Sequence, residues 1–249
     1  VIGVEALVRW RHPQRGLLGP EEFVGLMESS HLLEPFNRYV LCAATASCAR
    51  WQSHGVVLPV AVNISAAALR DRGIVRQVAD ALTTAALLPS LLTVEITETA
   101  LMEGGSQVTD TLLELRRLGV AVSIDDFGTG YSSLGRLSSL PLDELKIDRC
   151  FVSGAGTDDR SMAVLRLISD IGREMQLSVT AEGVETEQEL RRIVELGCDA
   201  VQGHLFARPM PEAELLAWLD RRDRLGQPRT VPMGTPTISS RRVSPPSAN

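Results

Sequence analysis

The sequence predicts an α/β fold, specifically a TIM-type (β/α)8 barrel. Short runs of β-branched residues alternate along the chain with longer segments of helical periodicity, which is typical of a parallel sheet covered by helices. With 249 residues, of which 44% are hydrophobic, the chain is long enough for one barrel and its core. The number of repeated units favours a barrel over an open sheet with a crossover.

Seven strands are predicted, whereas a complete barrel has eight. The chain opens on Val1 in the middle of the first predicted strand, so we expect the missing strand to lie upstream of Val1. The predicted strands cover residues 1–10, 58–65, 92–98, 120–127, 144–148, 177–185 and 200–206.

Several of the helices between the strands have recognisable ends. Thr186 and Glu189 form the pattern of a capping box, and the helix that they begin is expected to stop at Gly197. Residues 109–118 place leucines on one side of a helix and are followed by a glycine. Pro20 is a further signal for the start of a helix.

The domain is expected to span residues 1–225, and a disordered tail is expected over 226–249. The last helical pattern ends near residue 225, and the segment after it is rich in Pro, Ser and Thr without apolar periodicity. The arginines of this tail indicate solvation rather than a binding site for nucleic acid.

Composition excludes several classes of function. The net charge of −6 argues against a nucleic acid polymer or a membrane surface as partner, because such binding faces are normally basic. Four cysteines and four histidines lack the spacing of zinc sites, and the cysteines indicate reduced thiols in a cytoplasmic protein. No apolar stretch approaches the roughly 20 residues of a membrane helix. A membrane or sensor segment upstream of this sequence is compatible with these observations.

Acids and amides recur where the predicted strands end. Because the carboxyl ends of parallel barrel strands meet on one face, these side chains are expected to converge. A single one would usually be a helix cap or a solvated loop residue, so the recurrence is the informative signal. The set comprises Glu5, Asn63, Glu95, Glu98, Asp125, Asp126, Lys146, Asp148, Glu182, Glu185 and Gln202.

Asp125 and Asp126 are adjacent carboxylates, which repel each other unless a cation lies between them. All the candidate ligands offer oxygen, which favours Mg²⁺ or Mn²⁺, with Ca²⁺ able to compete. The excess of carboxylates suggests two ions that share a bridging acid, as in phosphoryl hydrolysis. Lys146 would supply positive charge or orient a water, and Arg9 would bind a phosphate oxygen.

The motifs that carry these residues resemble the EAL domain family of cyclic di-GMP phosphodiesterases. The likeness begins with Glu5-Ala6-Leu7 and Arg9 and extends, in the family's order and spacing, to about Pro211. The motifs read VNIS, EITETALM, IDDFGTGYSSL, LPLDELKID, TAEGVET and VQGHLFARPM. Together they are highly specific, whereas the letters E-A-L alone would mean nothing.

The resemblance implies a barrel enzyme that hydrolyses cyclic di-GMP to linear pGpG with Mg²⁺ or Mn²⁺, and that Ca²⁺ inhibits. It also implies two metal ions. Ligands of the first ion would be Glu5, Asn63, Glu95 and Asp125. Asp125 would bridge to the second ion, which Asp126 also binds.

The resemblance further assigns roles around the metals. Glu182, Lys146 and Gln202 are the implied catalytic residues, and Arg9 and Leu7 are implied to bind the substrate. Glu98 would tether the loop from Gly128 to Ser133. Glu185 would act through the residues that contact the metals rather than on the metals themselves. A homodimer, and a GGDEF or sensor domain upstream in a longer chain, are also implied.

Besides the missing upstream strand, two departures from the family pattern stand out. His204 lies where the family usually has Tyr, and Ala207 where it often has Ser; neither removes a metal ligand. Residues 132–143 also differ slightly, on a surface that the family uses for dimer contacts. The main alternative to an enzyme is a cyclic di-GMP receptor or interaction adaptor without catalysis. An unrelated metal-using barrel enzyme would leave the repeated motifs unexplained.

Overall fold

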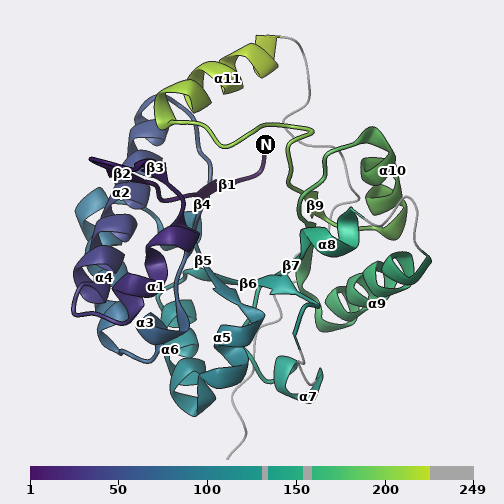
Figure 1. The fold of residues 1–249 in the computed structure, drawn as a ribbon, viewed down its shortest axis with the longest axis horizontal. Helices are drawn as coiled ribbons and strands as arrows, with labels where there is room; N and C mark the ends of the chain where they lie inside the picture. Colours follow the sequence, from purple (N-terminus) through teal and green to yellow (C-terminus); the bar gives the residue numbers. More distant parts are fainter. Residues whose placement is uncertain (131–133, 154–158, 225–249) are drawn as a thin grey trace, which may run out of the picture.

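The computed structural model describes residues 1–130, 134–153 and 159–224. Within these residues a seven-stranded sheet forms, and every neighbouring pair of its strands is parallel. The strands, in spatial order, are β1 (Val4–Ala6), β4 (Val60–Asn63), β5 (Leu92–Thr97), β6 (Ala121–Phe127), β7 (Glu144–Ile147), β8 (Ser178–Ala181) and β9 (Ala200–Val201). The sheet curls into a ring with helices outside it, and β1 and β9 form its two edges (Figure 1). The prediction of a TIM-like α/β fold is therefore confirmed.

The first predicted strand, 1–10, is wrong in its extent. Strand β1 ends at Ala6, and β2 (Trp10–His12) pairs antiparallel with β3 (Gly16–Leu18) in a separate hairpin. The ring nitrogen Nδ1 of His12 accepts the N–H groups of Gln14 and Arg15, which closes the turn. Glu5 and Arg9 interrupt the apolar residues of this segment, and Pro13 and Gly16 in the following turn are the sequence signals for the change of direction.

Helices cover the outside of the sheet. The long ones are α2 (Leu33–Ser53), α4 (Gly73–Ala85), α6 (Gly105–Arg117), α9 (Asp159–Met175), α10 (Glu187–Leu196) and α11 (Glu212–Arg224). Shorter ones are η1 (Pro20–Glu22), α1 (Val24–Glu28), α3 (Ala66–Leu69), η2 (Pro89–Leu91), α5 (Glu98–Glu103), α7 (Leu134–Leu137) and α8 (Arg149–Val152). The capping box of Thr186 and Glu189 is confirmed, and Gly197 ends α10 in the left-handed conformation with φ of 77°. The expected tail, 226–249, lies outside the described residues.

The two faces of the central strands differ in polarity because side chains alternate along a strand. On β6 and β7, Val122, Ile124, Leu145 and Ile147 are fully buried in the hydrophobic core beneath the helices. Burying each such side chain stabilises the fold by about 1.5–3 kcal/mol. The alternate positions hold polar residues instead, including Lys146. The apolar layer thus stabilises the ring from outside and leaves its interior for polar side chains.

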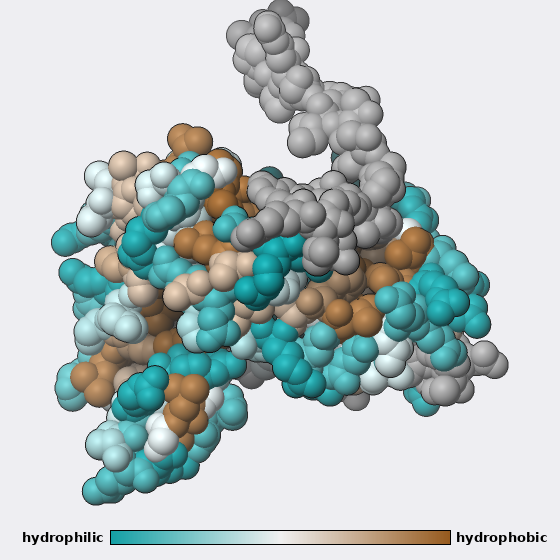
Figure 2. Space-filling model, turned by 90° about the horizontal axis from the view of Figure 1, so that it is seen from above, coloured by the Kyte–Doolittle hydropathy of each residue, from teal (hydrophilic) through white to brown (hydrophobic). Residues whose placement is uncertain are grey.

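The first residue of helix α11, Glu212, is hydrogen-bonded to α2. The carboxylate of Glu212 accepts hydrogen bonds from Ser47 Oγ at 2.9 Å and from Arg50 Nε at 3.0 Å. The segment between β9 and α11 therefore crosses the open side of the ring (Figure 1). The described part of this face carries separate hydrophobic patches among hydrophilic ones (Figure 2). Among the described residues, no helix combines the length and the apolar character needed to span a bilayer.

Candidate metal and catalytic site

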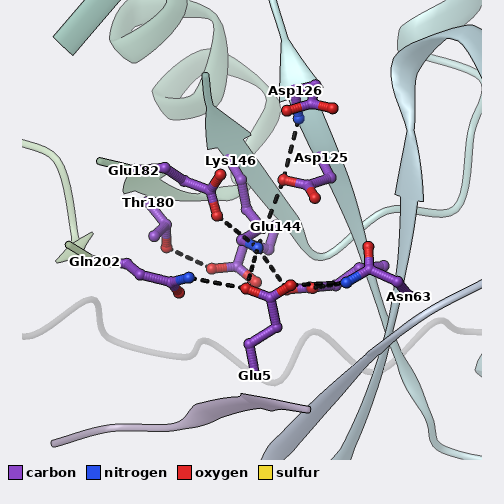
Figure 3. Close-up of polar contacts among 10 residues, drawn as sticks. Glu5, Asn63, Asp125, Asp126, Glu144, Lys146, Thr180, Glu182 and Gln202 are labelled. Atoms are coloured by element: carbon purple, nitrogen blue, oxygen red, sulfur yellow. Dashed lines mark hydrogen bonds and ion pairs between the residues drawn. The ribbon is translucent and has the colours of Figure 1, made fainter. Parts of the chain in front are cut away.

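Four of the strand-end carboxylates predicted to converge lie around Lys146. Its Nζ lies 2.8 Å from Glu95 Oε1 and 2.6 Å from Glu182 Oε1, and within 3.6 Å of Glu5 Oε2 and 3.5 Å of Asp125 Oδ1 (Figure 3). Only 3% of the Lys146 side chain is exposed, so these contacts are shielded from water. The 249-residue sequence contains one lysine, and it is this one.

The side-chain amides of Asn63 and Gln202 donate hydrogen bonds to the two carboxylate oxygens of Glu5. Asn63 Nδ2 donates to Glu5 Oε1 at 2.7 Å and reaches Glu95 Oε2 at 3.4 Å. Gln202 Nε2 donates to Glu5 Oε2 at 2.8 Å (Figure 3). Glu5 lies on β1 and Gln202 directly after β9, so the hydrogen bond between Gln202 and Glu5 links the two edges of the sheet.

An irregularity at the end of β6 explains how two adjacent aspartates serve one site. Neighbouring residues of a regular strand point to opposite faces. Here the register between β6 and β7 shifts between Ile124 and Phe127, and Asp126 adopts a left-handed φ of 55°. Such bulges re-aim side chains near functional sites, and a positive φ in a residue other than Gly is uncommon. Asp125 and Asp126 can therefore both present oxygens to the site.

The carboxylates form two overlapping groups that could each hold a metal ion. Ligand oxygens of Glu5, Glu95 and Asp125 lie within 4.8 Å of one another, and so do those of Asp125, Asp126 and Glu182. Asp125 belongs to both groups. The donors are carboxylate and amide oxygens, which suit hard divalent cations such as Mg²⁺ and Mn²⁺. The residues present therefore fit a metal centre.

Burial and crowding of like charges change the pKa values in this cluster. Burial raises the pKa of Glu95 to about 8 and that of Glu182 to about 7. Burial, together with the charge of Asp125, raises the pKa of Asp126 to about 6. Burial also disfavours the charged form of Glu5, but Lys146 and the two amides outweigh it and lower the pKa of Glu5. Without a metal ion, the raised pKa values thus favour protonated carboxyl groups in the cluster, and a bound metal ion would displace these protons.

Glu98 holds the loop that follows the aspartates. Its buried carboxylate accepts the backbone N–H of Gly128 at 2.9 Å and that of Gly130 at 3.2 Å. Gly128 has φ of 99°, and a Cβ there would lie 2.8 Å from the ring of Phe151, so only glycine fits. Residues 131–133 of the predicted loop lie outside the described residues.

Besides Glu98, three predicted residues lie outside the cluster around Lys146. Leu7, Arg9 and Glu185 instead line a cavity of about 820 Å³ that also borders Asp126, Glu182 and Gln202. This volume is in the range of pockets for drug-sized ligands, about 300–1,000 Å³. Among the described residues, the side chain of Arg9 donates a hydrogen bond to the carbonyl of its neighbour Val8 alone. Its guanidinium is exposed at the cavity and available to a ligand.

Three polar residues near the site were not assigned a role from sequence. The carboxyl groups of Asp148 and Asp126 are hydrogen-bonded, and Asp148 also caps α8 through Cys150 N–H. Thr180 donates to Glu144 inside the ring, beside Lys146 (Figure 3). Glu144 on β7 and Asp148, directly after β7, are each two positions from Lys146. The period of two along a strand could have indicated that all three share one face.

The fold and the site define a class: a parallel α/β barrel protein with an oxygen-rich centre at the carboxyl ends of its strands. Sequence comparison is more specific. The sequence model of the EAL domain family matches residues 1–209, and the chain belongs to this family.

Individual relatives agree with this assignment. Cyclic di-GMP phosphodiesterase NbdA of Pseudomonas aeruginosa is 45% identical over 217 residues, which cover 87% of this chain and 28% of NbdA. Oxygen sensor protein DosP of Escherichia coli is 39% identical over 218 residues, covering 87% of this chain and 27% of DosP. The solved structure "PaMucR Phosphodiesterase, c-di-GMP complex" matches with a TM-score of 0.83 at 42% identity, covering 86% of this chain and 87% of that one. The chain thus spans less than a third of the length of these two curated relatives.

Proposed function

We propose that this protein is a metal-dependent phosphodiesterase that hydrolyses cyclic di-GMP to linear pGpG. The observation that carries the proposal is the buried Lys146 ringed by Glu5, Glu95, Asp125 and Glu182. The names of NbdA and of the PaMucR structure support the same substrate and reaction. In the reaction, water adds to one phosphorus and one P–O ester bond breaks, which opens the ring.

The proposal includes two Mg²⁺ or Mn²⁺ ions. Glu5, Asn63, Glu95 and Asp125 would hold one of them, and Asp125 and Asp126 would hold the other. When bound, such ions lower the pKa of a coordinated water and polarise the phosphoryl group. The shared position of Asp125 in both carboxylate groups supports this division. We expect Ca²⁺ to inhibit, because its longer bonds and larger ligand number would change the geometry of the site.

The chain's own residues would orient the attack. Lys146 would hold the attacking water by donating a hydrogen bond from Nζ, and Glu182, its partner at 2.6 Å, would accept the proton of that water. Gln202, which directly follows β9, would hold Glu5 and the substrate in position. Arg9 and Leu7 would bind the nucleotide in the cavity.

Further parts of the proposal concern the surroundings. Glu98 would couple the loop after Asp126 to the site, and a homodimer would act on that loop. The small share of each curated relative that this chain spans supports additional domains, such as a GGDEF or sensor domain, in a longer protein. The four cysteines are free thiols, which supports a cytoplasmic location.

The alternative is a cyclic di-GMP receptor that has lost catalysis. Incubating the purified chain with cyclic di-GMP and Mn²⁺, and separating the nucleotides by chromatography, distinguishes the two. Formation of pGpG that stops when the metal is chelated supports the enzyme. Binding of cyclic di-GMP without any product would support the receptor instead.

A further inference from the structure

We propose that His204 is a specificity-determining residue for the nucleotide and that Glu185 positions it. The inference rests on the proposed function and adds a recognition group to the same site. His204 Nδ1 lies 3.6 Å from Glu185 Oε1, and both residues line the cavity that borders Glu182 and Gln202. With 40% of the His204 side chain exposed, the imidazole is open to a ligand.

The backbone around this pair is interlocked. Val184 N–H donates to the carbonyl of Gln202 at 3.0 Å, and Leu205 N–H donates to the carbonyl of Val184 at 3.0 Å. These two bonds clamp the turn that carries His204 onto the turn that carries Glu185.

Gly203 makes this approach possible. A Cβ at residue 203 would lie 2.1 Å from the carbonyl oxygen of Val184 and 2.4 Å from its backbone nitrogen. A side chain there would force the two turns apart. The contact between His204 and Glu185 is therefore built into the backbone, as is the placement of Gln202 beside the metal ligands.

The chemistry of the pair follows from which ring nitrogen faces the carboxylate. A separation of 3.6 Å is too long for a direct hydrogen bond, yet the negative charge of Glu185 favours the tautomer with hydrogen on Nδ1. In that neutral tautomer Nε2 is an acceptor. An acceptor on the cavity wall matches the N–H donors on the edge of a guanine base. We therefore assign His204 Nε2 to reading such an N–H group.

The pair is separate from the reacting groups. Glu185 and His204 make no contact with Lys146 among the ion pairs of the described residues, whereas Glu182 does. The two should therefore affect binding of the nucleotide more than the chemical step. A tyrosine at position 204 would offer a hydroxyl, which both donates and accepts, in place of this acceptor.

The test is a set of variants assayed for kcat and KM with cyclic di-GMP and Mn²⁺. His204→Ala should raise KM about tenfold with little change in kcat, since one net hydrogen bond is lost. His204→Gln, which keeps an acceptor oxygen, should recover part of the loss. Glu185→Ala should also raise KM, and the double variant should be no worse than His204→Ala alone. His54→Ala serves as the control, because exposed His54 does not line the cavity.

The outcomes separate this inference from the proposed function. A wild-type protein that hydrolyses cyclic di-GMP, with KM unchanged in His204→Ala or additive effects in the double variant, overturns the role of the pair alone. A wild-type protein that neither binds nor hydrolyses cyclic di-GMP overturns the proposed function as well. Melting temperatures of the variants within about 2 °C of wild type would show that folding is intact, as expected for partly exposed positions.

Discussion

Replacement of Lys146 by methionine tests how far one ammonium holds the metal-free site together. Lys146 Nζ is within 4.0 Å of carboxylate oxygens from four residues: Glu5, Glu95, Asp125 and Glu182. Methionine is of similar length and fills the space without charge. The variant leaves four crowded, mostly buried carboxyl groups with no cation of the protein to balance them.

The expected magnitude follows from the burial of these groups. Removing one partner of a buried ion pair typically costs about 3–5 kcal/mol. For a domain of this size, 1 kcal/mol shifts the melting temperature by about 2–4 °C. In EDTA, Lys146→Met should therefore melt about 6–20 °C below wild type. Protonation of Glu95, whose pKa burial raises to about 8, relieves part of the repulsion, which favours the lower end of this range.

The assay is thermal unfolding in EDTA and then in excess Mn²⁺. A cation that binds the folded state at 100 times its Kd stabilises by about 2.7 kcal/mol, so Mn²⁺ should recover a large part of the loss. Mn²⁺ should not restore turnover, because the variant lacks the group that we propose holds the attacking water. Arg76→Met is the matched control. The side chain of Arg76, which forms an ion pair with Asp80, is 86% exposed, so loss of this pair should barely change the melting temperature. A Lys146→Met variant as stable in EDTA as wild type would refute this account of the cluster.

Three further predictions concern the same site. In Glu98→Ala, the N–H groups of Gly128 and Gly130 lose their acceptor, so kcat should fall at least tenfold. The affinity for Mn²⁺, measured by calorimetry, should stay near that of wild type. An unchanged kcat would show that the loop has no part in the mechanism. In EDTA, the pKa of Glu95 is about 4.5 in the unfolded state and is raised to about 8 by burial in the folded state. The stabilisation that this shift contributes is complete below pH 4.5 and is lost as the pH rises to about 8. The melting temperature of wild type relative to Glu95→Gln should therefore fall between pH 5 and 8.5, and a constant difference would contradict the raised pKa. Because Lys146 is the only lysine, protein made with lysine labelled with ¹⁵N at Nζ should give one labelled ammonium signal that shifts on addition of Mg²⁺. No shift at saturating metal would place the ions elsewhere.

Much of the fold could be predicted because its signals are local. Short runs of β-branched residues located the parallel strands, and the capping box at Thr186 located the start of α10. The convergence of the strand-end acids followed from one topological rule, that parallel strands end on the same face. That rule needs no knowledge of side-chain contacts, which is why it worked from sequence alone.

Other features depend on contacts between distant residues and could not be predicted. The hairpin at 10–18 is an exception, because its signals are local: His12 accepts the N–H groups of the residues two and three positions later, and the turn contains Pro13 and Gly16. The bulge that turns both aspartates toward the site depends on the pairing of β6 with β7. The position of Glu185 against His204 depends on the close approach permitted by Gly203.

The most direct test of the central claim is turnover of cyclic di-GMP in Mn²⁺ by wild type and by Asp125→Asn. Asp125 is the one residue common to both carboxylate groups, and asparagine keeps its shape while removing the charge. We predict pGpG from wild type and a loss of at least a thousandfold in Asp125→Asn, about 4 kcal/mol of lost transition-state stabilisation. Normal turnover by Asp125→Asn would contradict a shared metal centre at Asp125.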